Sequence, residues 1–587
     1  MSVVLQSTMP SPAPVGTVIT WTASVNDPAP GDIWYRFRVR QLGPDFHTVR
    51  DFGPVTSLDI LTREGNYDLE VMARNVATGD MAVKTVLFQS VSAVAGGQPV
   101  VLPTTNALVY LYSAPACPVG GRMRVEFRPA FTGPAIRPAR ARSVRDTSRS
   151  GGEELPQTTP WQDCLDGMNL NVLLGGMRAE TEYTAQQVVQ VGSNEVQGPV
   201  LSFRTGQIGA ILPASALRVP PQRLLPQQTL LLGGFSVSVA MDVKGNVVWY
   251  HCCISMTRPA GGGTFFGIIS SGSGGPSARL VREFDLLGLP VRETNAARIN
   301  EQLAAMGMRQ IDAFHHEARP LPGGKILVLA STEQVLTDVQ GPGPVNVLGD
   351  MILVLDQELQ VEWVWDSFAH LDVARRAVLD EDCGACPPLT GGTPEDTKDW
   401  LHGNAVERTA DGNLLYSARH QDWLFKIDYR DGEGSGAVLW RLGKDGDFQL
   451  DASGTYPWFS HQHDAEFEAD GTLTLFDNGN TRQELYPDAH SRGQAIQLDE
   501  AGRVAHLMLN ADLRAYSLAL GSAQQLSDGN YHFNSGWLQR VPNALPSFSY
   551  ATEVDPSGEF VYRLEVSAPL YRSFRLNSLY DSDHPLP

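Results

Sequence analysis

Three stretches in the second half of the chain place a histidine or an asparagine at the same distance from a glycine turn. They read HHEARPLPGGKILVLAS, GNAVERTADGNLLYSAR and QHDAEFEADGTLTLFDN, and their turn glycines are Gly324, Gly412 and Gly471. Eight residues before each glycine stand His316, Asn404 and His463. A neutral imidazole is a nucleophile near pH 7, and imidazoles also carry protons. The repeated pattern therefore indicates a polar site built from several copies of one unit.

An arginine and a further histidine are expected at the same end of these units. In a strand hairpin, the start of the first strand and the end of the return strand lie side by side. Arg419 ends the return strand whose partner begins near Asn404, and His402 stands two residues before Asn404. We therefore expect His316, His402, Asn404, Arg419 and His463 to meet at one channel mouth.

The elements that must position these groups are short strands in units of four. Each glycine hairpin is followed by a second hairpin, as in LFKIDYRDGEGSGAVLWRLG and AIQLDEAGRVAHLML. Four short antiparallel strands per unit are typical of a propeller blade. Weaker copies turn at Gly245 and Gly529, and the remaining chain allows a sixth unit closed from both ends. We predict a six-bladed β-propeller over residues 230–587.

Two other interpretations of the histidine cluster compete with a catalytic one. His461 and His463, with an aspartate beside them, have the character of metal ligands. However, Arg419 at the same rim repels a cation, and no carboxylate occupies the matched positions. We therefore predict no bound metal ion. The other interpretation is a water-filled channel with polar walls and no chemistry.

Before the repeats, the chain alternates in the manner of β-sandwiches. Residues 1–95 contain TVITWTASV and IWYRFRVR, and residues 98–206 end in YTAQQVVQVGSNEVQGPVLSFRTG. The corner LGGMRAETEY resembles that of a fibronectin type III module. We predict an immunoglobulin-like sandwich over 1–95 and a fibronectin type III-like sandwich over 98–206, so the predicted fold class is all-β. A proline-rich linker, LPASALRVPPQRLLPQQ, follows.

The composition limits the partners. The 587 residues carry 45 basic and 65 acidic side chains, which gives a net charge of −20. This charge argues against nucleic acid and anionic membranes as partners. No run of about 18 apolar residues predicts a membrane-spanning helix. The first residues, MSVVLQSTMPSPAPVG, lack the pattern of a signal peptide.

The six cysteines predict two disulfides. Cys383 and Cys386 lie in DEDCGACPPLTGG, where a short loop disulfide is favoured over a thioredoxin-like motif. Cys117 and Cys164 are expected to bridge within the second sandwich. Disulfides favour a periplasmic or secreted protein, whereas the missing signal peptide favours the cytoplasm, and both alternatives stay open. The two cysteines whose state is left open are Cys252 and Cys253.

Part of the chain resembles the bacterial arylsulfate sulfotransferases. The residues that carry the resemblance are WLHGNAVERTADGNLLYSARHQDWLFKIDY, VLWRLG, WFSHQHDAEF and LFDNGNTR, with HHEARPLPGGKILVL upstream. The resemblance covers about residues 230–565. It implies a six-bladed propeller after an N-terminal β-sandwich, and a nucleotide-independent, ping-pong transfer of a sulfuryl group between phenols through a sulfohistidine. The chain departs from the family in having two sandwich-like segments where one is expected.

The resemblance also implies roles for individual residues. His463 would be the nucleophile. The other residues expected in catalysis are His402, Arg419, Asn404 and His316. Substrate contacts are expected from His315, His461, Trp458 and Phe459. These two aromatic residues and Trp400 lie near the expected mouth and are suited to bracket a phenolic ring, with a place in the hydrophobic core as the alternative.

The chemistry agrees with these residue types. Sulfuryl transfer should pass through a loose transition state with charge on the peripheral oxygens, which an arginine fork and imidazole N–H groups stabilise. A second histidine can protonate the departing phenolate. No GxxxxGK[ST] loop is present, and we predict that no cofactor is needed. The competing hypothesis is a non-catalytic or metal-binding propeller that recognises glycans or proteins. The natural donor and acceptor and the oligomeric state are open, a homodimer being one alternative.

Overall fold

The chain folds almost entirely as β-sheet, as its alternating sequence predicts. The structure is a computed structural model, and it describes residues 1–130, 156–223, 225–270, 275–383, 397–540 and 547–582. Strands account for most of the regular structure, and helices are few and short. The all-β fold class is therefore confirmed.

Residues 229–576, as far as they are described, contain six antiparallel units of four strands. The first unit comprises β44 (Leu570–Leu576), β19 (Thr229–Gly234), β20 (Val237–Asp242) and β21 (Val247–Cys252). The second comprises β22 (Ser255–Gly261), β23 (Thr264–Ile269), β24 (Leu280–Asp285) and β25 (Pro290–Asn295). The third comprises β26 (Phe314–Leu321), β27 (Lys325–Thr337), β28 (Pro344–Leu355) and β29 (Val361–Asp366).

The other three units follow in chain order. The fourth comprises β31 (Gly403–Arg408), β32 (Leu414–Ala418), β33 (Trp423–Ile427) and β34 (Val438–Gly443). The fifth comprises β36 (His463–Phe467), β37 (Leu473–Asp477), β38 (Arg492–Asp499) and β39 (Val504–Asp512), and the sixth β40 (Gly521–Gln525), β41 (Tyr531–Leu538), β42 (Phe548–Val554) and β43 (Phe560–Val566). Three further strands extend these sheets: β18 (Ser215–Val219) pairs with β43, β30 (Thr397–Asp399) with β28, and β35 (Gln449–Asp451) with β39.

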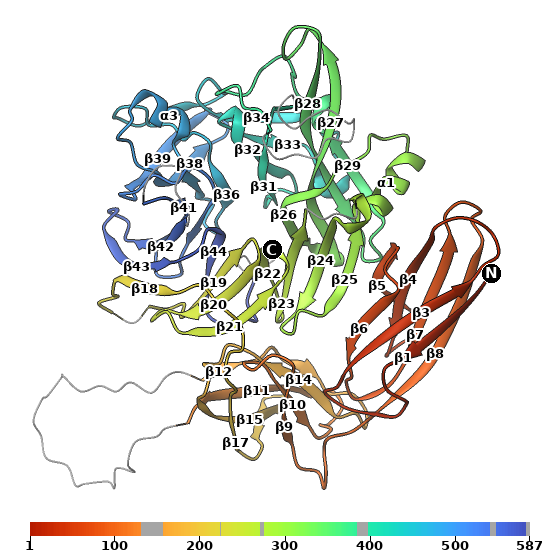
Figure 1. Cartoon of the computed structure of the whole chain (residues 1–587). Helices are drawn as coiled ribbons and strands as arrows, with labels where there is room; N and C mark the ends of the chain where they lie inside the picture. Colours follow the sequence, from red (N-terminus) through yellow and green to blue (C-terminus); the bar gives the residue numbers. More distant parts are fainter. Residues whose placement is uncertain (131–155, 224, 271–274, 384–396, 541–546, 583–587) are drawn as a thin grey trace, which may run out of the picture.

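The first strands of neighbouring units lie next to one another. β26 contacts β22 and β31, β36 contacts β31 and β40, and β44 contacts β40 and β22. In Figure 1 these strands stand toward the middle of the six sheets, and strands such as β25, β39 and β43 lie toward the outside. The residues that begin the first strands are therefore gathered in the centre of this part of the molecule.

Glycine turns join the strands, but they are not all equivalent. Gly412, Gly471 and Gly529 have positive φ angles of 79°, 83° and 85°, and each joins the first two strands of its unit. Gly245 instead joins β20 and β21. These are the third and fourth strands of their unit, because the first strand of that unit is β44. The prediction that the Gly245 turn is equivalent to the others is therefore wrong. The unit β22–β25, which turns at residues 261–263, was not recognised from the sequence because it lacks an Asp-Gly or Lys-Gly turn.

The first N-terminal group of strands packs two sheets around Trp21, Phe37 and Leu69. One sheet contains β1 (Ser2–Ser7), β3 (Val18–Asn26) and β6 (Ser57–Leu61). The other contains β2 (Ala13–Pro14), β8 (Met81–Val91), β7 (Gly65–Asn75), β4 (Ile33–Arg40) and β5 (His47–Gly53). Its edge strand β5 meets β25 in parallel, where Arg50 pairs with Glu293. One sheet thus continues from the N-terminal strands into the second unit.

The second N-terminal group is also built from two sheets. One contains β14 (Leu170–Leu174), β10 (Tyr110–Ala114) and β9 (Val100–Pro103). The other contains β12 (Gln157–Thr158), β13 (Gln162–Asp163), β11 (Arg122–Pro129), β15 (Glu182–Val191), β16 (Asn194–Gln197) and β17 (Leu201–Arg204). The hydroxyl of Tyr183 accepts a hydrogen bond from Arg178 N at 3.0 Å, which is the tyrosine corner that the sequence predicts. Cys117 and Cys164 form the predicted disulfide.

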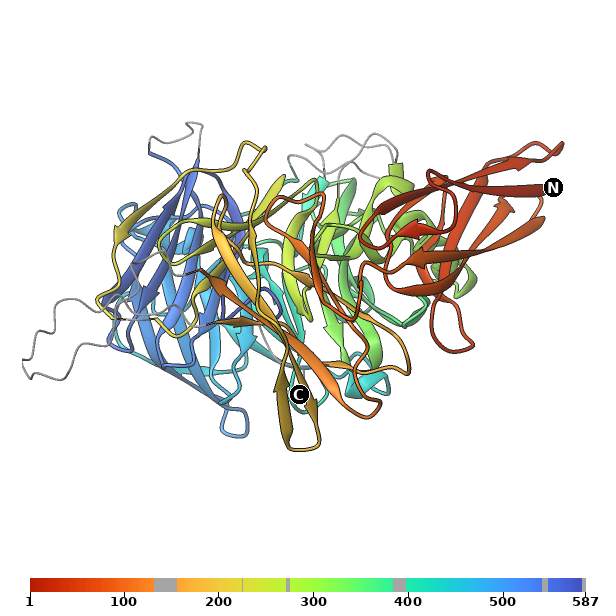
Figure 2. The ribbon, with the colours of Figure 1, turned by 90° about the horizontal axis from the view of Figure 1, so that it is seen from below.

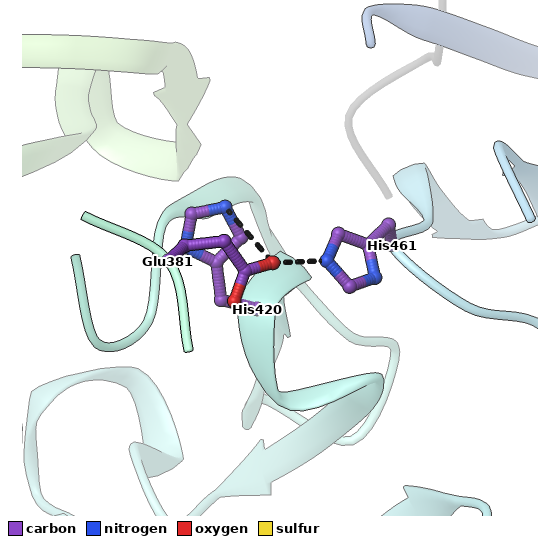
Figure 3. A group of neighbouring side chains, drawn as sticks. All are labelled: Glu381, His420 and His461. Carbon is purple, nitrogen blue, oxygen red and sulfur yellow. Dashed lines mark hydrogen bonds and ion pairs between the residues drawn. The ribbon is translucent and has the colours of Figure 1, made fainter. Parts of the chain in front are cut away.

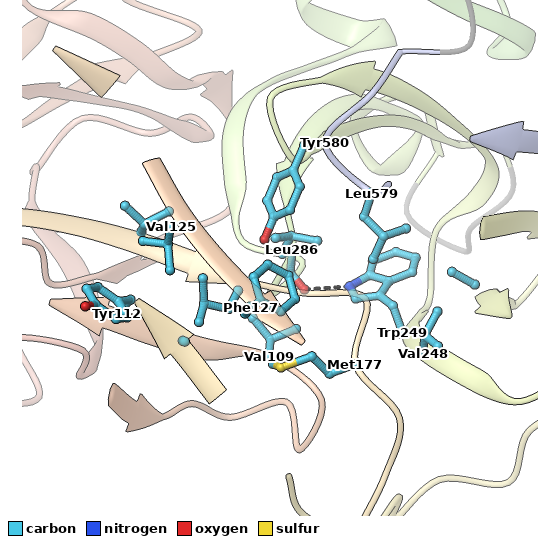
Figure 4. Close-up of a cluster of buried hydrophobic side chains, with 14 of the residues drawn as sticks. Val109, Tyr112, Val125, Phe127, Met177, Val248, Trp249, Leu286, Leu579 and Tyr580 are labelled. Atoms are coloured by element: carbon cyan, nitrogen blue, oxygen red, sulfur yellow. Dashed lines mark hydrogen bonds between the residues drawn. The ribbon is translucent and has the colours of Figure 1, made fainter. Parts of the chain in front are cut away.

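A buried hydrophobic cluster joins this second group to the first of the six units (Figure 4). Phe127 and Met177 of the N-terminal group pack in one cluster with Trp249 and Tyr580. The Tyr580 hydroxyl donates to Leu173 O at 2.8 Å. Figure 2, seen from below, shows the N-terminal strands lying against the six sheets. The six units are therefore anchored to the N-terminal strands by packing, and not by a linker alone.

Helices are minor elements. Among the described residues they are α1 (Ala296–Ala305), α2 (Ser367–His370), α3 (Asn480–Leu485) and the 3₁₀ turns η1 (Gly275–Ala278), η2 (Pro322–Gly324), η4 (Arg419–Gln421) and η5 (Arg430–Gly432). None of the helices in the described ranges has both the length and the apolar character that a membrane crossing needs.

Candidate active site

His463 begins β36 and is fixed in one orientation by Asn478, the residue after β37. The two atoms that meet are His463 Nδ1 and Asn478 Oδ1, 2.6 Å apart. The amide nitrogen of Asn478 donates to Ser517 O at 2.9 Å and to Leu520 O at 3.0 Å, so its oxygen must be the atom that faces the ring. A carbonyl oxygen can only accept, so Nδ1 carries the proton. The lone pair of His463 is therefore on Nε2.

His463 is kept neutral by its surroundings. It is buried, and burial together with the nearby guanidinium of Arg419 holds the pKa of His463 well below its usual range. His402 and Arg572 lower this pKa further. An imidazole that stays unprotonated near pH 7 keeps its lone pair available for attack.

Tyr571, on β44, stands between two of the predicted histidines. Its ring centroid lies 5.6 Å from that of His316 and 6.4 Å from that of His463. His316 lies 4.8 Å from His402, measured between ring centroids. The structure thus brings His316, His402 and His463 together, as predicted, around a tyrosine that the sequence analysis did not identify.

His402 is the accessible member of the group, with about a third of its side chain exposed. Its Nδ1 lies 2.6 Å from Asp399 Oδ2. Burial alone would raise the pKa of Asp399, but the nearby rings of His402 and His420 outweigh burial and lower it. Asp399 is therefore a carboxylate that orients the ring of His402 through Nδ1, and this leaves Nε2 of His402 free for proton exchange.

Arg419 lies in η4 and is largely buried. Its Nη2 donates to Leu518 O at 3.2 Å, and its Nη1 lies 2.5 Å from His420 Nε2. The Nε atom is buried without a hydrogen-bond partner among the described residues. The guanidinium is thus held by protein contacts on one side and retains an unused donor.

His461 is held between the carboxylates of Asp422 and Glu381, and Figure 3 shows Glu381 between His461 and His420. Its Nδ1 lies 2.8 Å from Asp422 Oδ1, and its Nε2 contacts Glu381. Burial lowers the pKa of His461, but Asp422 and Glu381 outweigh burial and raise it above its usual value. His420 lies beside this pair, with its ring centroid 5.6 Å from that of His461. His461 is fully buried between these carboxylates, and its predicted contact with substrate stays a prediction.

Asn404 contacts the backbone next to His463, and His315 contacts the side chains of Asp350 and His316. Asn404 Nδ2 donates to Gln462 O at 2.7 Å, immediately before His463. His315 Nε2 lies 3.0 Å from an oxygen of Asp350, and its Nδ1 lies 2.7 Å from Nδ1 of His316. Asn404 therefore positions the chain that carries His463, and His315 orients His316.

The backbone departs from regular strand geometry at these histidines. φ is positive at His316, His402, His461 and Asp464, with values of 58°, 49°, 51° and 51°. The strand register also shifts in this region, within Phe314–Ala318, Gly403–Ala405 and His463–Glu466. Bulges re-aim side chains, and residues with positive φ gather at functional sites. The same irregularity in three units directs their side chains toward one place.

A buried charge network lies beneath the histidines. Arg572 Nε lies 2.7 Å from Asp464 Oδ1, and its Nη2 donates to Asn404 O at 2.8 Å. Arg258 Nη2 lies 3.0 Å from Asp464 Oδ1 and 2.7 Å from Glu466 Oε1. These arginines join β22 and β44 to β36, and they fix the strand that carries His463.

Three groups of side chains within the described ranges have the spacing of metal ligands, with ligand atoms within 4.8 Å of one another. They are Glu381, His420 and His461; Asp399, His402 and His420; and Glu317, Asp464 and Glu466. The first two share His420, whose Nε2 faces the cationic Arg419, and the third is neutralised by Arg258 and Arg572. Arginines at each group make all three poor cation sites. No carboxylate occupies the matched positions, but Glu381, Asp399 and Asp422 reach the histidines from outside the aligned positions, Asp399 from the end of β30.

Two of the aromatic residues near the predicted mouth belong to the core. Phe459 has no exposed surface and packs with Trp440 and Leu473. Trp400 is buried, and its indole donates to Arg375 O at 2.8 Å. Trp458 is partly buried against the same cluster as Phe459. The side chain of Phe459 is therefore part of the hydrophobic core in this structure, and its predicted contact with substrate stays a prediction.

Two cavities lie outside the histidine cluster in the described part of the chain. One, of about 820 Å³, is lined among others by Arg375, Trp400 and Trp423. The other, of about 650 Å³, is lined among others by Glu407 and Lys426. His463 lines neither cavity.

The cysteine predictions have different outcomes. Cys383 is buried, but Cys386 lies outside the described residues, so the predicted Cys383–Cys386 disulfide stays a prediction. Cys252 and Cys253 are free and exposed.

Comparison with known proteins gives one informative match. A family model for arylsulfotransferases (ASST) matches residues 222–572. No curated protein matches the chain. A segment of two fibronectin type III domains from chicken tenascin is 16% identical, with 35% of this chain and 98% of that chain covered and a TM-score of 0.14.

Two bacterial α-2-macroglobulin structures also match. The Salmonella protein reacted with methylamine is 10% identical, with 97% of this chain and 44% of that chain covered and a TM-score of 0.12. The Escherichia coli protein activated by porcine elastase is 9% identical, with 97% and 50% covered and a TM-score of 0.12. TM-scores this low carry no argument about fold or function.

Proposed function

The chain belongs to the arylsulfotransferase family, and we propose that it moves a sulfuryl group from an aryl sulfate to a phenol by a ping-pong mechanism through a sulfated His463. Membership of the family makes it a transferase. The observation that carries the finer proposal is the orientation of His463. Its Nδ1 is bonded to Asn478 Oδ1, and its Nε2 is therefore the nucleophilic atom.

In the first half-reaction, Nε2 of His463 attacks the sulfur atom of the aryl sulfate. A bond forms between nitrogen and sulfur, and the bond between sulfur and the phenolic oxygen breaks. The departing phenolate takes a proton from Nε2 of His402, whose Nδ1 is held by Asp399. General acid catalysis of this kind contributes roughly 10²–10⁴ in rate.

In the second half-reaction, the neutral His402 accepts the proton of the acceptor phenol. The phenolate oxygen attacks sulfur, and the electron pair of the nitrogen–sulfur bond returns to Nε2 of His463. In both steps, charge develops on the sulfuryl oxygens. Arg419 supplies the cation beside His463, and its unused Nε–H is an available donor. His316 lies beside His402, where its ring limits the space for the phenol.

We also propose that the six units close into a six-bladed propeller over residues 230–587, preceded by sandwich domains over 1–95 and 98–206. The succession of contacts from β22 through β26, β31, β36 and β40 to β44 supports this. A periplasmic or secreted location is proposed because the Cys117–Cys164 disulfide suits an oxidising compartment. Cell fractionation tests the location, and light scattering tests whether the protein is a homodimer.

The proposed activity is tested with a chromogenic aryl sulfate and a second phenol as acceptor. We expect release of the coloured phenol and formation of the sulfated acceptor, without any nucleotide. If neither product forms with a panel of phenols, the proposal fails, and the competing hypothesis of a propeller that binds glycans or proteins gains support.

A further inference from the structure

Two adjacent cysteines lie at the surface where β21 ends. Cys252 and Cys253 are exposed free thiols, and their Sγ atoms lie 2.7 Å apart. A disulfide bond needs about 2.05 Å, so only a small movement separates this pair from bond formation. Cys253 has a positive φ of 75°, and its N–H donates to Ser236 O at 2.7 Å. The backbone thus holds both thiols on the same side of the loop.

The strand that follows these thiols, β22, contacts the histidine cluster directly. Three residues after Cys253, Met256 also has a positive φ, of 57°. The backbone N–H of His316 donates to the sulfur atom of Met256 at 3.2 Å. His316 lies beside His402, so a shift of Met256 acts on the residues that line the proposed site.

A second path runs through aromatic rings. The Ser255 hydroxyl donates to Phe235 O at 2.6 Å. The ring of Phe235 lies 6.3 Å from that of Tyr571, between centroids. Tyr571 in turn contacts His316 and His463. The cysteine loop is therefore coupled to the site through two independent sets of contacts.

We propose that Cys252 and Cys253 are a redox site, and that their oxidation by a low-molecular-weight disulfide such as oxidised glutathione slows sulfuryl transfer. The effect on transfer rests on the proposed function, whereas the redox site itself does not. In the first step, the thiolate of one cysteine attacks the glutathione disulfide, forms a mixed disulfide and releases one glutathione thiolate. In the second step, the other cysteine attacks the mixed disulfide and releases the second glutathione.

The two cysteines together lose two electrons and two protons, and the glutathione disulfide is reduced to two thiols. Cys252 is the better attacking group, because the hydrogen bond to Cys252 and partial burial raise the pKa of Cys253. Forming the bond draws the two sulfur atoms together and changes the backbone that leads to Met256. A misplacement of about 1 Å near reacting groups can lower a rate by about 10². We therefore expect oxidation to lower the rate of sulfuryl transfer by at most about 100-fold.

The test uses the full chain, first reduced and then treated with oxidised glutathione. We expect the peptide that contains both cysteines to lose about 2 Da, because two hydrogen atoms leave when the disulfide forms. The matched controls are the single variants Cys252→Ser and Cys253→Ser. In each, the remaining thiol should keep the glutathione adduct, since no second thiol can displace it. Dithiothreitol should reverse both products.

The coupling is measured by two readouts. Hydrogen exchange of the peptide that contains the His316 amide should become faster on oxidation, because the bond to Met256 is weakened. The rate of aryl sulfate turnover should fall, and the double variant Cys252→Ser/Cys253→Ser should lose no activity under oxidation.

Failure to lose the two hydrogen atoms overturns the redox site. Loss of them with unchanged exchange at His316 and unchanged turnover overturns the coupling. If the reduced protein transfers no sulfuryl group at all, the proposed function fails, and the mass and exchange measurements still decide whether the redox site exists and reaches His316.

Discussion

Replacing Asn478 tests whether the tautomer of His463 is set by one amide. In Asn478→Ala, the ring loses the acceptor of its Nδ1–H, and the two carbonyls of Ser517 and Leu520 lose their donor. The bond to His463 is worth about 0.5–1.5 kcal/mol. At about 1.4 kcal/mol per tenfold change, kcat/KM should fall about 2- to 12-fold.

The same substitution should also reduce stability. Three hydrogen bonds at about 0.5–1.5 kcal/mol each give a loss of about 1.5–4.5 kcal/mol in the free energy of unfolding. Asn413→Ala is a matched control, because Asn413 is also buried and its amide oxygen accepts from Tyr429 N, at the far end of its hairpin. This control should lose stability without a comparable fall in kcat/KM at a temperature where both variants are folded.

Asn478→Asp separates the tautomer from the charge of the ring. A carboxylate beside Nδ1 favours the protonated imidazole and raises the pKa of His463. Protonated His463 has no lone pair, so turnover should fall at neutral pH and recover as the pH rises. The alanine variant should not recover in this way. Steady-state rates measured across a range of pH show the pH dependence of turnover in both variants. Unchanged kcat/KM in a folded Asn478→Ala, together with a flat pH profile of the aspartate variant, would refute the assignment of Nε2 as the nucleophile.

Three further predictions follow from the other contacts of the site. Arg419→Lys keeps the charge but loses the planar guanidinium and the unused Nε–H that we propose stabilises the sulfuryl oxygens. Turnover should fall by about 10²–10³, and near-normal turnover would make Arg419 structural. Asp399→Asn removes the carboxylate that holds His402, so kcat should fall more for donors whose phenols are poor leaving groups, and an equal loss for all donors would argue against acid catalysis by His402. Asp422 and Glu381 raise the pKa of His461 against the opposing effect of burial. The stability that protonated His461 contributes is therefore present below the ordinary histidine pKa and is lost as pH rises through the raised pKa. The urea midpoints of the parent and His461→Gln should converge at high pH, and a constant difference between them would contradict this.

The sequence predicts the fold and the core of the site because both depend on repeated local patterns. The glycine turns at Gly412, Gly471 and Gly529 and the alternation around them identify the strand hairpins. His316, Asn404 and His463 lie at the same distance from the turns of their hairpins. This shared position is enough to predict that the three residues lie at the same end of their strands. The tyrosine corner at Tyr183 follows from a local motif, and the Cys117–Cys164 disulfide follows from the place of both cysteines in one predicted sandwich.

The rest of the site could not be predicted, because it depends on contacts between distant segments. Glu381 and Asp399 flank residues 384–396 outside the repeat, and nothing in their local sequence indicates that they meet His461 and His402. Tyr571 lies on the last strand, which joins the site only because β44 pairs with β19. The sequence places Phe459 just before the histidines and does not show that its side chain packs with Trp440 and Leu473 in the hydrophobic core.

The central claim is that the sulfuryl group passes through His463. The most direct measurement mixes the protein with a chromogenic aryl sulfate and no acceptor, and follows the release of phenol in the first turnover. We expect a burst of about one phenol per protein molecule. Peptide mapping under alkaline conditions should place the added sulfuryl mass on the peptide that contains His463, and His463→Ala should show neither burst nor label. A burst that persists in His463→Ala, or a label on His461 or His316 in the parent protein, would contradict the account.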